Sequence, residues 1–136
     1  MTRETKRVKV SKTQFTQYKR IADGFFEGAE NEKELSNWNS AGVLIIHAAI
    51  AYTDAVTIKY GGVRSKGDDH QDVVRLIDSL LPQTEAKKSA LNQLEKLIAH
   101  KTSVSYSGET YDNKDIEKLF KHLERFKSWA EKQIAD

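Results

Sequence analysis

Apolar residues recur at intervals of three and four along most of the chain, which is the spacing that places them on one face of an α-helix. One such stripe begins at Phe15 and predicts a helix over roughly residues 12–31. A second stretch is apolar on nearly every side and predicts a buried central helix over roughly 37–59, ended by Gly61 and Gly62. Strand-like alternation is almost absent, so the predicted fold class is all-α.

The second half of the chain shows the same helical spacing three more times. A short helix is predicted within residues 68–81, a fourth helix begins near Thr84, and a last one begins at Asp112 or Asn113. The segment 103–112 is polar and predicts a loop. Because the connections are short, we expect an up-and-down bundle of four to five mostly antiparallel helices.

The length and charge of the chain favour one small globular domain. The 136 residues predict a single helical domain over 12–136, preceded by a basic, flexible N-terminal arm at residues 1–11. That arm is either a frayed terminus or a segment that seeks phosphate. Elsewhere, 22 basic and 20 acidic residues are too evenly balanced to indicate a nucleic-acid binder by charge alone.

Several classes of protein are disfavoured by composition. The chain has no cysteine, which excludes disulfides and thiolate metal sites. Its N-terminus lacks the apolar core of a secretory signal, and the longest apolar run, 41–51, is interrupted by His47 and too short to cross a bilayer. We therefore expect a cytoplasmic protein without membrane contact. No histidine pair at helical spacing or glycine-rich phosphate loop occurs, so no metal or cofactor is predicted.

His47 and Asp54 are the side chains between Ala41 and Ile58 that can carry a charge near neutral pH. They are seven positions apart, so they share a face but lie about 10 Å apart along the axis and cannot bond directly. Each needs a partner on another helix, and for Asp54 the candidates are His70, Arg75 and Lys101. The pair is either a set of satisfied core groups or a polar stripe that lines a cleft.

Arg64 and His70, with five residues between them, form the one candidate catalytic pair. Metal-independent RNA cleavage needs a general acid or base and a cation for the developing phosphate charge, and these two residue types supply both. However, Asp68, Asp69 and Asp72 crowd the same stretch, would repel phosphate, and are natural helix caps. The first interpretation is therefore that this stretch is a loop whose acidic residues cap the next helix. The second is that Arg64 and His70 are a nuclease pair.

Three stretches carry a resemblance to a known family. They are "NWNSAGVLIIHAAIAYTDAVTIKYGG", "SKGDDHQDVVRLIDSLL" and "LNQLEKLIAHKTSVSYSGETYDNKDIEKLFKHLERFKSWAEKQI". In order, they contain an Ala-rich central helix with an Asp, a short helix opened by a His, a basic residue preceding a Tyr, and an amphipathic last helix. This arrangement resembles the HEPN superfamily over roughly residues 12–135.

The resemblance implies a helical bundle, commonly a symmetric homodimer, that works on nucleotides or RNA in toxin–antitoxin, defence or stress systems. It also implies a nucleotidyltransferase as a possible protein partner. Active members carry an Arg, four to six residues, and then a His late in the chain. The corresponding stretch here is Lys101 to Tyr106, where Lys keeps the charge but Tyr is a poor proton shuttle near neutral pH.

The leading functional hypothesis is therefore a catalytically inactive HEPN-like binding module for a nucleotide, RNA or protein. Its candidate ligand-binding residues are His47, Asp54, His70, Lys101 and Tyr106. One alternative is an active metal-independent endoribonuclease that uses Arg64 and His70. Another is a structural or immunity-type dimer with no small ligand.

Overall fold

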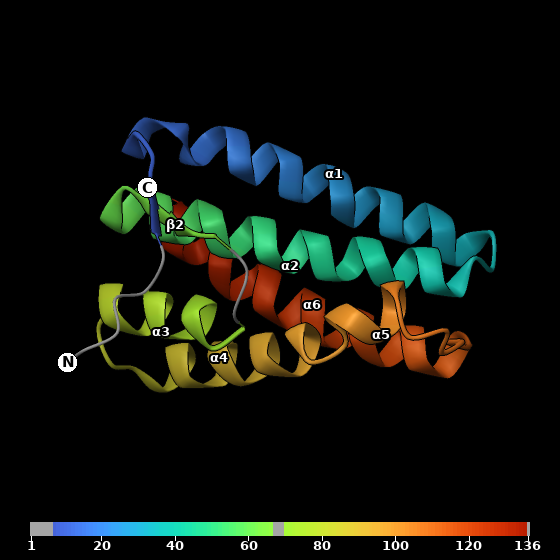
Figure 1. The fold of residues 1–136 in the computed structure, drawn as a ribbon. Coiled ribbons are helices and arrows are strands. Elements are labelled where there is room, and N and C mark those ends of the chain that lie inside the picture. The colour runs from blue at the N-terminus through green and yellow to red at the C-terminus, as the bar shows by residue number, and fades with distance from the viewer. Residues whose placement is uncertain (1–6, 67–69, 136) are drawn as a thin grey trace.

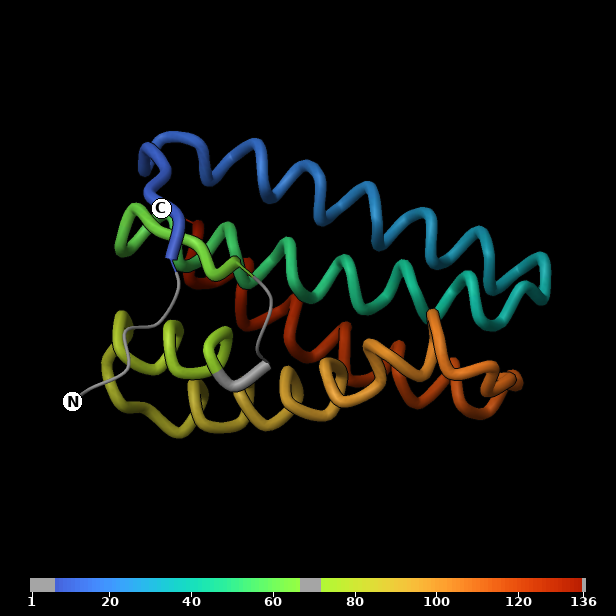
Figure 2. Tube along the Cα trace, viewed as in Figure 1, coloured from blue at the N-terminus to red at the C-terminus, as the bar shows by residue number. Residues whose placement is uncertain are grey.

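Four long helices form the frame of the molecule (Figures 1 and 2). The structure is a computed structural model that describes residues 7–66 and 70–135, with the backbone alone at positions 70 and 71. The long helices are α1 (Phe15–Glu34), α2 (Trp38–Gly61), α4 (Glu85–Ile98) and α6 (Asn113–Ile134). They alternate in direction along the chain (Figure 1), so the prediction of an all-α, up-and-down bundle is confirmed.

The central helix α2 is the core of the bundle, as its all-round apolar sequence predicted. It contacts α1, α3, α4, α5 and α6, and small residues such as Ala48, Ala49 and Ala55 are fully buried where these neighbours approach. By length and composition alone α2 could cross a membrane, but 72% of its most apolar window is buried inside the bundle. Its hydrophobicity is thus accounted for by packing between helices.

Local side-chain bonds begin two helices where the sequence predicted. The hydroxyl of Thr84 accepts a hydrogen bond from the backbone N–H of Lys87 at 3.0 Å, which caps α4. At α6, Asp112 and Asp115 form a reciprocal capping box, in which each carboxylate accepts from the other's backbone N–H at 2.9 and 3.0 Å. Such caps satisfy N–H groups that have no partner within the helix.

A short antiparallel strand pair includes the last part of the predicted N-terminal arm. β1 (Arg7–Lys9) pairs with β2 (Val63–Ser65), and Val8 lies opposite Arg64. Gly62, with φ of 63°, turns the chain out of α2, and its carbonyl accepts from the N–H of Val10 at 2.8 Å. Residues 7–9 are therefore held by backbone bonds that no pattern in so short a segment predicts, whereas residues 1–6 lie outside the described part.

The chain after α4 also differs from the prediction of a polar loop at 103–112. It forms a short helix, α5 (Lys101–Ser105), and Tyr111 is buried. Asn39 at the start of α2 fastens this segment: its amide donates to the carbonyls of Val104 and Glu109, and its oxygen accepts from the N–H of Tyr111. Hydrogen bonds from Asn39, which is distant in sequence, thus hold the segment 104–111 in a defined conformation.

Two smaller helices complete the described fold. The 3-10 helix η1 (Lys12–Gln14) leads into α1, and α3 (His70–Leu80) packs between α2 and α4. Figure 2 shows that α3 runs in the same direction as α2, because the strand β2 first brings the chain back along that helix. This return places β2 beside the last turns of α2, where the candidate site lies.

Candidate functional site

Asp54 and Arg64 form the most unusual electrostatic pairing in the described part of the chain. Asp54 lies in the second half of α2, and Arg64 lies in β2, directly after the turn at Gly62. Burial raises the pKa of the Asp54 carboxyl to about 7, and the positive charge of Arg64 offsets only part of that effect. A carboxyl group with a near-neutral pKa exchanges protons readily at physiological pH, which is a property of many functional sites.

The guanidinium of Arg64 retains unused hydrogen-bonding capacity. Its Nε is buried and has no partner among the described residues. Its Nη1 donates only a long bond of 3.4 Å to the backbone carbonyl of Ser65. No hydrogen bond or ion pair joins Arg64 to Asp54 in the described ranges. Because a buried N–H without an acceptor is costly, a guanidinium in this state favours an anionic ligand.

The charge of Arg64 acts on Asp54, although the sequence did not name Arg64 among the candidate partners. Arg64 of the following strand lowers the pKa of Asp54 through its charge, whereas Arg75 forms an ion pair with Asp72 on its own helix. Lys101 lies on α5 and makes no described bond to Asp54. The reason is topological: β2 folds back along α2, so a residue close in sequence reaches Asp54 first.

The predicted ligand-binding set does not assemble among its described members. His47 is exposed, and its ring lies 5.6 Å from that of Phe25 on α1. Tyr106 is 84% exposed and follows α5, which packs near the start of α2 (Figure 1), whereas Asp54 lies in the second half of α2. None of the described bonds or ring contacts joins two of His47, Asp54, Lys101 and Tyr106.

His70, the remaining candidate, begins α3, but its side chain lies outside the described residues, as do the predicted caps Asp68 and Asp69. The pairing of the Arg64 and His70 side chains in one site therefore stays a prediction. What the structure adds is Asp54: the sequence paired Arg64 only with His70, because proximity between α2 and β2 leaves no mark in the sequence pattern.

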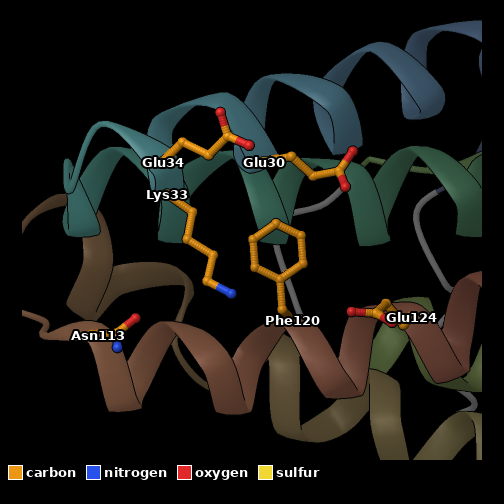
Figure 3. Close-up of a pocket in the computed structure, with 6 residues that line it drawn as sticks. All are labelled: Glu30, Lys33, Glu34, Asn113, Phe120 and Glu124. Atoms are coloured by element: carbon orange, nitrogen blue, oxygen red, sulfur yellow. The ribbon is translucent and has the colours of Figure 1, made fainter.

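A hollow between α1 and α6 is lined mainly by acidic side chains, in contrast to the surroundings of Arg64 (Figure 3). It has a volume of about 290 Å³ and is lined by Glu30, Lys33, Glu34, Asn113, Phe120 and Glu124. The ammonium of Lys33 lies 5.5 Å from the centroid of the Phe120 ring, so the hollow already holds a cation of its own chain. Its carboxylates would repel a phosphate, so this hollow is not a candidate site for one.

Within the described ranges, no group of three or more His, Asp or Glu side chains is placed to hold a metal ion. A carboxyl and a guanidinium, such as those of Asp54 and Arg64, are suited to proton transfer and to stabilising negative charge on a ligand.

Comparison with protein families gives one match. A family model described as "HEPN domain" matches residues 15–133, which include α1 to α5, all of α6 but its last residue, and both residues of the candidate site. A comparison with curated proteins finds no match.

Proposed function

Because the chain belongs to the HEPN domain family, we propose that it is a nucleotide- or RNA-directed module that recognises a phosphate group through Arg64. The observation that carries this proposal is the buried Nε of Arg64, which has no acceptor among the described residues. A phosphate oxygen is the acceptor that suits a guanidinium best, since the two can form parallel charge-assisted hydrogen bonds.

The protonation of Asp54 leaves the positive charge of Arg64 available to an anionic ligand. With a pKa of about 7, the Asp54 carboxyl is largely protonated in slightly acidic solution and does not fully cancel the charge of Arg64. A bound phosphate would favour the protonated form further, because a second negative charge nearby disfavours ionisation. The protonated carboxyl could then donate its own hydrogen bond to the ligand.

Calorimetric titration with adenosine 5′-monophosphate and with a short single-stranded RNA tests this proposal. We expect Arg64→Ala to weaken binding by about tenfold or more, the usual loss for a charge-assisted bond. Arg64→Lys should recover only part of it, because Lys lacks the planar fork. Arg20→Ala, on the exposed surface of α1, is the matched control and should bind as the wild type does. Equal affinity of Arg64→Ala and wild type would refute the proposal.

Metal-independent endoribonuclease activity is the second candidate, and the pKa of Asp54 favours it. A carboxylate with a pKa of about 7 could remove the proton from a ribose 2′-hydroxyl, whose oxygen then attacks the adjacent phosphorus. Arg64 would stabilise the charge on the phosphate, and His70 would protonate the departing 5′-oxygen. The products would be a 2′,3′-cyclic phosphate and a free 5′-hydroxyl.

An RNA cleavage assay in EDTA separates the two candidates. Wild type, Asp54→Asn, Arg64→Ala, His70→Ala and Tyr106→Phe are compared on the same single-stranded RNA. If the chain is a binding module, none of them cleaves. If it is a nuclease, cleavage by the wild type disappears in the first three variants and persists in Tyr106→Phe, since Tyr106 lies on the exposed surface near α5.

A homodimer remains part of the proposal, on the strength of the family resemblance. The apolar surface of α2 gives no separate reason for a dimer, because most of that surface is buried within one copy. Light scattering at micromolar concentration should give twice the mass of the 15.5 kDa chain. A monomer under those conditions would exclude a stable dimer.

A further inference from the structure

A groove between α4 and α6 carries an excess of positive charge that the fold itself does not neutralise. It has a volume of about 660 Å³, within the usual range for ligand sites. Its cationic residues are Lys96 on α4 and Lys118, Lys121 and Arg125 on α6. None of these four forms an ion pair within the described part of the chain.

The cations of α6 lie on one side of that helix, at positions that neighbour each other. Lys118 and Lys121 are three positions apart, and Lys121 and Arg125 are four apart. Like charges at this spacing destabilise a helix by a few tenths of a kcal/mol per pair. Asp115, the one carboxylate among the described residues that line the groove, is engaged in the capping box at the start of α6. A surface selected for stability alone would pair these charges.

Two histidines extend the polar wall and are held in fixed orientations. His100 Nδ1 lies 2.8 Å from the hydroxyl of Tyr111, and His122 Nδ1 lies 2.5 Å from Oε1 of Gln93. Since an amide oxygen only accepts, Nδ1 of His122 carries the proton and Nε2 is left available. The pKa of His122 is lowered first by burial and then by the surrounding positive groups, which are Lys96, Arg125, His100 and Lys118.

We propose that this groove, hereafter the α4–α6 groove, binds the phosphate backbone of a nucleic-acid strand. The cations from Lys118 to Arg125 extend about 10 Å along α6, which suits successive phosphates better than a single one. Tyr111, the one Phe, Tyr or Trp side chain among the described residues that line the groove, is buried, and the two histidine rings are partly buried and held by hydrogen bonds. Binding is therefore independent of base sequence. This site is additional to Arg64 and stands whether or not Arg64 holds a phosphate.

Fluorescence anisotropy with a labelled single-stranded RNA, measured over a range of salt concentrations, tests the groove. The variant Lys118→Gln/Arg125→Gln removes two groove cations, and Arg20→Gln/Lys88→Gln removes two exposed cations elsewhere. The two variants have the same net charge. We expect the groove variant to lose about tenfold in affinity at low salt and its salt slope to fall by about 1.4, the value for two lost phosphate contacts. The control should match the wild type.

Each of the following results would overturn the proposal: no RNA binding by the wild type at low salt, equal losses in both double variants, or an unchanged salt slope. Unlabelled RNA and DNA should both displace the probe. Equal displacement by inorganic polyphosphate, at the same phosphate concentration, would rule out a nucleic-acid strand as the specific ligand. Arg64→Ala should keep the salt slope of the groove, which separates failure at this site from failure at Arg64.

Discussion

At Asp54, burial and charge act in opposite directions, and burial has the larger effect. The folded-state pKa of about 7 exceeds the ordinary value of 3.8, so the folded chain holds a proton that the unfolded chain has released between these two pH values. The contribution of Asp54 to stability is therefore greatest below about pH 4 and declines as the pH rises towards 7. The decline approaches about 1.4 kcal/mol per pH unit for one such proton.

Asp54→Asn removes this titration, so we predict that it is similar in stability to the wild type near pH 4 and more stable at pH 8. Urea unfolding at both pH values measures the difference. Glu27→Gln, which removes an exposed carboxylate from α1, should follow the wild type. Parallel stability profiles for Asp54→Asn and wild type would mean that Asp54 is solvated when folded.

Lys87 is a buried cation with a structural role. Its side chain is 2% exposed, and its Nζ donates to the carbonyls of Asp78 and Leu81 at 3.1 Å, besides pairing with the Asp78 carboxylate at 2.7 Å. We predict that Lys87→Met lowers the free energy of unfolding by about 2 kcal/mol, because carbonyls at the end of α3 lose their donor. Lys88→Met, at the exposed neighbouring position, should be close to neutral in the same denaturant assay.

Two glycines within helices should respond in opposite ways to alanine. A Cβ at Gly24 in α1 meets no atom within 4 Å, so Gly24→Ala should stabilise the protein by about 1 kcal/mol through helix propensity. A Cβ at Gly42 in α2 would lie 2.9 Å from Cγ1 of Val104 on α5. Gly42→Ala should therefore destabilise it by about 1–3 kcal/mol.

Thermal unfolding of the two single variants measures this contrast, and the double variant Gly42→Ala/Val104→Ala isolates its cause. Removing the Val104 methyl groups opens space for the new Cβ, so the double variant should lose less stability than the sum of its single changes. Strict additivity would show that α2 and α5 do not approach as closely as the structure indicates.

The whole molecule should unfold as one unit, because α2 is the shared neighbour of all the other α-helices. Trp38 at the start of α2 and Trp129 on α6 report on different parts of the bundle. We predict that tryptophan fluorescence and far-ultraviolet circular dichroism give the same denaturation midpoint. A separate early loss of helical signal would indicate that one helix pair unfolds independently.

The sequence by itself determined the helices and their class, because the interactions that specify a helix are local. The spacing of apolar residues, the caps at Thr84 and Asp112, and the glycines after α2 all act within a few positions. The short connections predicted the antiparallel bundle, and the match over residues 15–133 confirms the family that the sequence resembles. The sequence predicted the candidate site only in part. It indicated Arg64 and Asp54 as residues of interest, but it did not indicate that the two lie close together.

What only the tertiary structure decided are the contacts between segments that are far apart along the chain. Asn39 orders a segment 72 positions away, and β1 pairs with a strand beyond α2. The α4–α6 groove likewise exists only because two helices present their cations to the same space. These features depend on which faces of the helices pack together. The packing that forms is the one that leaves the least apolar area exposed over the whole bundle. Periodicity within a single helix reveals its apolar face, but not the helix that covers it.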